Sequence, residues 1–300
     1  MIRDSRSINV LDRFSIRRSD KKWIINKFRD EKARIIPVHN STVLLCGSAK
    51  EPKAVFLTYN DLAKPLDLAD SLVFLGIYDE IPYFAVDIIS DEVASNLAQK
   101  TNGSFQSIRW ILSLLNYRDC ELLTLASFMT YWHSRNQYCG KCGNKTKSRD
   151  SGHIRTCKNE ICNAKYFPSM DPAVIVLVSS KEQCLLGRQK GWPKGMYSTL
   201  AGFVEPGETA EDAVVREIKE EVSVSIDKVE YQYSQSWLFP SSLMLGFTAL
   251  AKEKNISLNT DELEDARWFT KEEIKLNPHI LPNKASIAHK LIMAWVDRGS

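Results

Sequence analysis

The sequence that decides the fold of the last third of the chain is GFVEPGE at Gly202–Glu208, continued by REIKEE at Arg216–Glu221. The Pro-Gly pair in the first segment indicates a turn. Thr209 follows it and is a suitable N-cap. We therefore predict a helix from Ala210 to Val222.

Three carboxylates lie on one face of this predicted helix. Glu217, Glu220 and Glu221 stand at positions i, i+3 and i+4, within an arc of about 100°. They repel one another unless a cation lies among them, and oxygen ligands favour Mg²⁺ or Mn²⁺. Arg216 is spaced to reach Glu220. Such a cluster suits a pyrophosphate, because metal ions neutralise its oxygens and activate a bound water.

The common alternative is a charged, solvated helix, the usual fate of segments rich in Glu and Lys. The helix also carries an apolar stripe of Val and Ile, which indicates packing against a sheet. Upstream, Ala173–Val178 is an uninterrupted apolar run and predicts a buried strand.

A cluster of cysteines precedes this strand. Cys139 and Cys142 form a C-x-x-C-G turn, and Cys157 and Cys162 follow with four residues between them. Four thiolates satisfy tetrahedral zinc, so we predict one structural Zn²⁺ per chain in a closed site. Four free cysteines on a loop and an iron–sulfur cluster are the alternatives. A redox role for the first pair is disfavoured by the second pair.

Composition excludes several classes of protein. The 300 residues are 44% hydrophobic and 26% charged, which is typical of a folded globular chain of about two domains. No apolar run exceeds six residues, whereas a membrane helix needs about 20. The formal net charge of +3 requires no nucleic acid or membrane surface as partner.

The first half of the chain changes once from a β-rich pattern to a helical pattern. Residues 35–90 hold short β-rich runs, which include Thr42–Leu45, Ala54–Thr58, Ser71–Ile77 and Tyr83–Ile88. Residues 91–133 show helical apolar spacing. We predict an N-terminal α+β domain at 1–134, a zinc ribbon at 135–168 and a third domain at 169–300.

The helix segment resembles the Nudix box, Gly-x5-Glu-x7-Arg-Glu-U-x-Glu-Glu-x-Gly-U, in which U is apolar. The matching residues are Gly202, Glu208, Arg216, Glu217, Ile218, Glu220, Glu221 and Val224. Ser223 departs from the pattern, where the family has a Gly that closes the helix. The resemblance implies a Nudix hydrolase and an α-β-α sandwich fold for the third domain.

A second segment resembles the substrate array of the NADH pyrophosphatase branch of this family. Here it reads SQSWLFPSS at Ser234–Ser242, with Ser236 and Leu238 in place of two prolines. The zinc ribbon before the Nudix domain also resembles that branch. The alternative for this segment is an ordinary aromatic strand and turn.

The resemblance implies roles for named residues. It implies that the metal is bound by Glu217, Glu220, Glu221, Glu262 and the carbonyl of Ala201. Glu220 or Glu221 would accept the proton, and Arg216 would be a further catalytic residue. A surface charge is the alternative for Glu262. Substrate contacts fall to the following residues: Phe167, Gln235, Ser236, Trp237, Leu238, Phe239, Pro240, Ser241, Ser242 and Ala288.

The activity that this resemblance implies is hydrolysis of NADH, NAD⁺ or related dinucleotides to NMN(H) and AMP, with Mg²⁺ or Mn²⁺, by a homodimer. One alternative is removal of NAD caps from RNA. It rests on a basic ribbon whose cations are Lys141, Lys145, Lys147, Arg149, Arg155, Lys158 and Lys165. The other is a catalytically degenerate binding module.

No membrane partner is expected, and we expect an intracellular, cytoplasmic protein, with peroxisomal and mitochondrial locations left open.

Overall fold

A computed structural model of the protein describes residues 11–62 and 72–298. The described residues fall into two compact units. One holds Met170–Trp237 and the chain from Ser241 onward, and the other holds the chain up to Ser169 together with Leu238–Pro240. The ribbon residues therefore belong to the N-terminal unit, and the three-domain division stays a prediction. The expected strand start at Ser71 lies outside the described residues.

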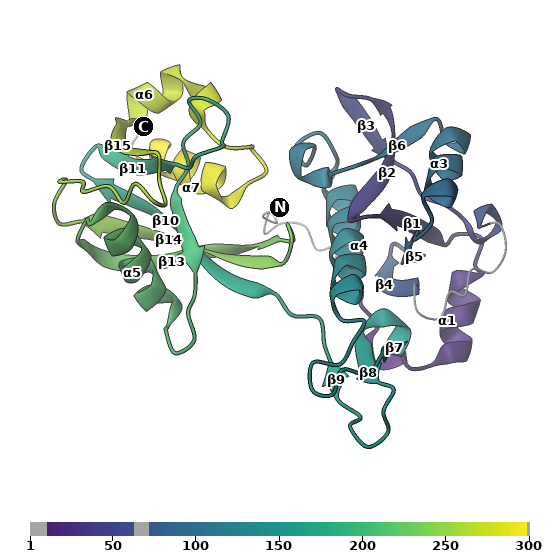
Figure 1. The fold of residues 1–300 in the computed structure, drawn as a ribbon. Coiled ribbons are helices and arrows are strands. Elements are labelled where there is room, and N and C mark those ends of the chain that lie inside the picture. Colours follow the sequence, from purple (N-terminus) through teal and green to yellow (C-terminus); the bar gives the residue numbers. More distant parts are fainter. Residues whose placement is uncertain (1–10, 63–71, 299–300) are drawn as a thin grey trace. The chain divides into compact units, whose positions relative to one another are not determined.

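A mixed sheet forms the centre of the C-terminal unit, in the order β13-β14-β10-β11-β15 with β12 paired to β10 (Figure 1). The central strand β10 runs parallel to β14 and antiparallel to β11 and β12. The strands are β10 (Asp171–Ser180), β11 (Gln183–Arg188), β12 (Leu200–Phe203), β13 (Ile226–Trp237), β14 (Ser242–Ala251) and β15 (Asp265–Thr270).

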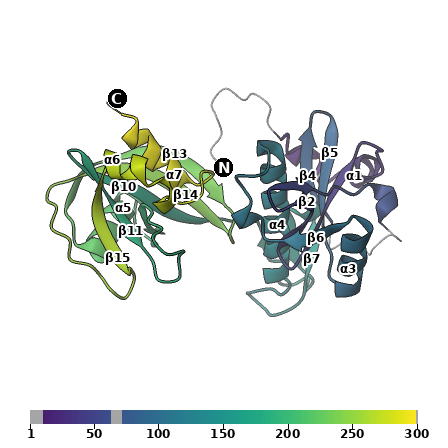
Figure 2. The same ribbon diagram turned by 90° about the horizontal axis from the view of Figure 1, so that it is seen from above.

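Helices cover both faces of this sheet. Val174 and Val176 of β10 pack in one core with α5 (Ala210–Val222). Ile175 and Leu177, which point the other way, pack in a second core with α6 (Lys271–Leu276) and α7 (Ile287–Val296). The apolar run is thus a strand buried on both faces, and the predicted α-β-α sandwich is confirmed (Figure 2).

Helix α5 has the predicted bounds and the predicted N-cap. The Thr209 hydroxyl accepts from the Asp212 backbone N–H, while the Asp212 carboxylate accepts from the Thr209 backbone, which makes a capping box. At the other end Ser223 adopts a left-handed conformation, with φ 58° and ψ 18°. Ser223 therefore takes the backbone conformation that a glycine adopts at this position of a helix end.

The N-terminal unit is built on a second sheet, in the order β3-β2-β1-β5-β4 with β6 paired to β2. Helix α4 (Tyr117–Arg135) packs against one side of it, and α1 (Lys21–Phe28) and α3 (Asp91–Lys100) lie on the other (Figures 1 and 2). Its strands are β1 (Arg34–His39), β2 (Thr42–Ser48), β3 (Glu51–Ala54), β4 (Leu72–Tyr78), β5 (Ile81–Asp87) and β6 (Gly103–Gln106).

One predicted strand of this unit is confirmed only in part. The β-rich run Ala54–Thr58 predicts a strand, but β3 ends at Ala54. A tight turn pairs Ser48 with Glu51 and sets the register of β3 before the apolar run begins. The Val55 N–H still donates to the Leu44 carbonyl of β2 at 3.1 Å, and Leu57 then bridges to Ile35 of β1.

The ribbon is a small antiparallel sheet, β7 (Thr146–Arg149), β8 (Ile154–Cys157) and β9 (Lys165–Tyr166). Across the described ranges, 11–62 and 72–298, no helix is both long enough and apolar enough to cross a bilayer.

We predict that Ser223→Gly stabilises the C-terminal unit. A left-handed residue with a side chain costs about 1 kcal/mol, which glycine avoids. Chemical denaturation should show the gain as a higher midpoint with an unchanged slope. Ser225→Gly, two residues away and outside the left-handed region, is the matched control and should lower the midpoint. Equal loss from both variants would contradict the explanation.

Candidate functional site

Arg216 is the centre of the acidic cluster. Its guanidinium contacts both carboxylate oxygens of Glu208, at 2.6 and 3.0 Å, and reaches Glu217 at 3.0 Å and Glu220 at 2.9 Å. It also donates to the backbone carbonyl of Phe203 at 2.8 Å. One cation therefore joins the end of β12, the turn before α5 and two glutamates of α5, as the i, i+4 spacing to Glu220 indicated.

Gly202 leaves the space that Glu217 occupies. A Cβ atom built at Gly202 would lie 1.9 Å from the Glu217 carboxyl group, so a side chain at this position would displace the glutamate. The need for glycine comes from this close approach of β12 to α5.

Glu221 is a buried carboxylate with an unsatisfied oxygen. Glu221 is 4% exposed, and its Oε2 atom has no hydrogen-bond partner. Burial, followed by the charges of Glu217, Glu262 and Glu220, raises the pKa of Glu221 to about 8. Burial also raises the pKa of Glu217, although Arg216 opposes the shift.

These observations fit a divalent cation. A buried carboxylate oxygen without a partner costs free energy, and a bound cation would remove that cost. Glu262 contributes to the pKa shifts of both Glu217 and Glu221, so its carboxylate lies within their electrostatic reach, although it comes from the turn before β15. Ala201 lies on β12, paired with Ile175. The metal-binding roles predicted for Glu217, Glu220, Glu221, Glu262 and Ala201 stay predictions.

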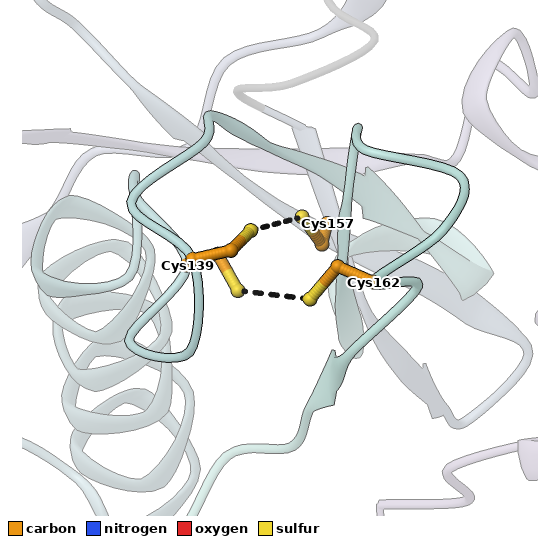
Figure 3. Close-up of side chains that lie close together, drawn as sticks. Cys139, Cys157 and Cys162 are labelled. Atoms are coloured by element: carbon orange, nitrogen blue, oxygen red, sulfur yellow. Dashed lines mark hydrogen bonds between the residues drawn. The ribbon is translucent and has the colours of Figure 1, made fainter.

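The four ribbon cysteines come together in the N-terminal unit. Their sulfur atoms all lie within 4.8 Å of one another, and all four are free thiols. Cys139 and Cys162 are 3.7 Å apart and Cys142 and Cys157 are 3.5 Å apart (Figure 3). A tetrahedral zinc with Zn–S bonds of about 2.3 Å needs sulfurs about 3.8 Å apart. The geometry therefore matches a closed, four-thiolate zinc site.

Outer-shell groups support these sulfurs. The Tyr166 hydroxyl lies 3.1 Å from the Cys139 sulfur, and the backbone N–H of Asn159 donates to the Cys157 sulfur. Such hydrogen bonds stabilise thiolates and orient them toward the ion.

Arg155 corrects one expectation. The sequence places it among the basic residues of the ribbon, but in the structure it is 1% exposed. Its guanidinium donates to the Thr146 hydroxyl at 2.7 Å and contacts the His133 ring at 2.9 Å, and the other ring nitrogen of His133 lies 2.8 Å from the Gly152 carbonyl oxygen. Arg155 joins the ribbon to α4 and is not available to a phosphate.

The amide of Gln235 has partners inside the fold. Gln235 is 2% exposed; it donates to the Ala285 carbonyl at 2.8 Å and accepts from the Ile287 N–H at 2.7 Å. It thereby holds the start of α7, which carries the buried residue Ala288. Its predicted direct contact with substrate stays a prediction.

The other predicted substrate residues are placed as follows. Ser236 and Trp237 end β13, and the buried Ser242 begins β14. The Ser241 hydroxyl donates to Asp171 at 2.6 Å. Leu238, Phe239 and Pro240 cluster with the N-terminal unit, as does Phe167, whose side chain is 59% exposed.

Phe203 is a residue next to the cluster that the motif spacing does not predict. Its ring is 59% exposed, and its carbonyl accepts from Arg216, so an apolar face lies in solvent next to the acidic cluster. An aromatic residue directly after the glycine of the box was the available signal.

Three family models match the chain. They describe a NUDIX domain at residues 168–296, an NADH pyrophosphatase zinc ribbon domain at 134–167 and an NADH pyrophosphatase-like rudimentary NUDIX domain at 32–132.

Curated relatives match over most of the chain. The human NAD-capped RNA hydrolase NUDT12 is 34% identical over 97% of this chain and 72% of its own length. The human mitochondrial NAD(P)H pyrophosphatase NUDT13 is 37% identical over 77% of this chain and 72% of its own length. The NAD-capped RNA hydrolase NudC of Pseudomonas aeruginosa is 42% identical over 60% of this chain and 62% of its own length.

We predict that Glu221 makes the stability of the C-terminal unit fall with rising pH when Mg²⁺ and Mn²⁺ are absent. Its folded pKa of about 8 lies above the ordinary value of 4.5, so the folded state binds the proton more tightly. The stabilisation is present at low pH and is lost as the pH rises toward 8, with each pKa unit equivalent to about 1.4 kcal/mol. Thermal unfolding between pH 5 and pH 8.5 measures it.

Glu221→Gln should flatten this profile, because the neutral amide does not titrate. The exposed residue Glu211 lies on the same helix, and Glu211→Gln should keep the wild-type slope. Parallel profiles for the wild type and Glu221→Gln would show that Glu221 is ionised throughout.

Proposed function

Because the chain belongs to the Nudix hydrolase family, with the zinc ribbon of its NADH pyrophosphatase members, we propose that it hydrolyses the diphosphate bond of NADH, NAD⁺ and related dinucleotides to NMN(H) and AMP. The observation that carries this proposal is the carboxylate cluster around Arg216, with the unsatisfied oxygen of Glu221 at its buried side.

The cluster would hold Mg²⁺ or Mn²⁺ through Glu217, Glu220, Glu221 and Glu262 with the carbonyl of Ala201, and the ions would neutralise the phosphate oxygens and activate a water. The chain's own contribution is positioning. Arg216 holds Glu217 and Glu220 toward one region although their charges repel.

A carboxylate accepts the proton of the attacking water. Glu220 and Glu221 are both candidates: Glu220 is half-exposed and paired with Arg216, whereas Glu221 is buried with a free oxygen. Bases with a pKa near the working pH are the most effective.

Aromatic side chains would orient the dinucleotide. The exposed ring of Phe203 lies next to the acidic cluster and offers an apolar face to a nicotinamide or adenine. By resemblance to the family, Trp237 and Phe239 would add further ring surfaces, and the protein would be a homodimer with one structural zinc per chain.

We predict that the wild type releases AMP and NMN(H) from NADH in the presence of Mg²⁺ or Mn²⁺. Glu220→Gln and Glu221→Gln, singly and together, should lower kcat by at least about 100-fold, the low end for loss of general-base catalysis. Mass analysis of the products from a dinucleotide panel measures this.

Glu211→Gln is the control, since Glu211 lies on the same helix with its side chain in solvent. Unchanged AMP release from the double variant would refute the site assignment. A folded wild type inactive on every dinucleotide would favour a binding module.

A second candidate substrate is NAD-capped RNA. Two of the relatives carry that name, and the ribbon keeps several exposed cations after the removal of Arg155 from the set. These are Lys141, Lys145, Arg149, Lys158 and Lys165.

We predict that, if RNA is a substrate, its turnover falls with salt more steeply than that of free NADH, because phosphate contacts release counterions. Reversal of Lys158 and Lys165 to Glu should lower RNA turnover and leave NADH turnover unchanged. An equal salt response for both substrates would speak against contact with the RNA backbone.

A further inference from the structure

Two loops of the C-terminal unit meet at Arg188, the last residue of β11. One loop joins β11 to β12, and the other carries Glu262 and leads into β15. Arg188 lies between them with a side chain that is 12% exposed. Nothing in the proposed chemistry uses this buried cation.

The guanidinium of Arg188 has acceptors from both loops. It donates to the carbonyl oxygens of Pro193 at 2.5 Å, Trp192 at 3.0 Å and Met196 at 3.3 Å. Its Nε contacts the Glu264 carboxylate at 2.9 Å. The planar fork of an arginine can serve several acceptors in fixed directions, which a lysine ammonium cannot reproduce.

Further hydrogen bonds connect the same two loops. The Arg188 carbonyl accepts from the N–H of Glu264 at 2.8 Å. The ammonium group of Lys190, in the first loop, donates a hydrogen bond to the Thr260 carbonyl at 3.0 Å. The segment from Thr260 to Glu264 is therefore attached to β11 and its loop at both ends.

The same segment is attached to α5. The Asn259 backbone N–H donates to the Glu221 carbonyl at 2.9 Å, and the Leu263 N–H donates to the Asn259 carbonyl at 3.0 Å. Leu263 is 2% exposed and packs in the core with α5. Glu262 thus lies on a short turn with α5 on one side and Arg188 on the other.

We propose that Arg188 is a positioning residue, which holds the Glu262 turn against α5 through Glu264 so that Glu262 faces the same cation as Glu217 and Glu221. This proposal rests on the proposed function, because it assigns Glu262 to that cation. Arg188 itself touches neither the cation nor the substrate.

The test measures Mn²⁺ binding to the full chain with its zinc. Electron paramagnetic resonance monitors the binding in the absence of substrate. Glu262→Gln is the reference variant. Arg188→Lys and Glu264→Gln should each weaken Mn²⁺ binding by roughly tenfold, the low end for outer-shell partners of metal ligands. The pair Arg188→Lys with Glu262→Gln should bind no more weakly than Glu262→Gln alone, because both changes remove one contribution.

Glu230→Gln is the charge-matched control, since Glu230 lies exposed on β13 away from both loops, and it should bind Mn²⁺ as the wild type does. Thermal unfolding of each variant separates loss of the fold from loss of binding, and Glu264→Gln keeps the carbonyl contacts of Arg188.

The outcomes that overturn the proposal are wild-type Mn²⁺ affinity in Arg188→Lys and Glu264→Gln, additive losses in the double variant, or no effect of Glu262→Gln. Failure of the proposed function would look different: the wild type would bind Mn²⁺ and show the same variant pattern, but would hydrolyse no dinucleotide.

Discussion

The crowding of carboxylates around one guanidinium is the constraint on which the C-terminal unit depends. Like charges on adjacent helical positions repel, and burial of Glu221 adds a desolvation cost. Arg216 offsets part of the repulsion through ion pairs with Glu208, Glu217 and Glu220. The carboxyl group of Glu221 lies on the buried side, where Arg216 does not reach, and in the proposed site a divalent cation would contribute most there.

The two metal sites follow different chemistry. The ribbon uses four sulfurs in a closed tetrahedral arrangement, which suits zinc and leaves no position for a water. The carboxylate site uses hard oxygen donors from α5 and from a separate turn, so it suits Mg²⁺ or Mn²⁺ and can admit a phosphate. The first site would stabilise a small sheet with little core of its own, and in the proposed function the second carries the chemistry.

Buried polar side chains do much of the positioning in this protein. Arg155 joins the ribbon to α4, Gln235 holds the start of α7, and Arg188 connects two loops. Arg155 and Gln235 pair with groups inside the fold, whereas Arg188 is 12% exposed and pairs with carbonyl oxygens of a surface loop. The residues proposed to bind metal and substrate are therefore held in place by side chains that themselves only make contacts within the fold.

Local spacing and helical periodicity along the chain were enough to predict α5, its N-cap at Thr209, the buried strand β10 and the four cysteines that come together in the ribbon. The metal-binding roles of the carboxylates stay predictions. The bounds of β3 and the surroundings of Arg155, Gln235 and Arg188 were decided by the tertiary structure. Spacing along the chain places Glu217, Glu220 and Glu221 on one face, but it does not show that a turn about 40 residues later brings Glu262 to them. Nor does it tell a solvated arginine from a buried one, because burial depends on which distant segments pack around the side chain.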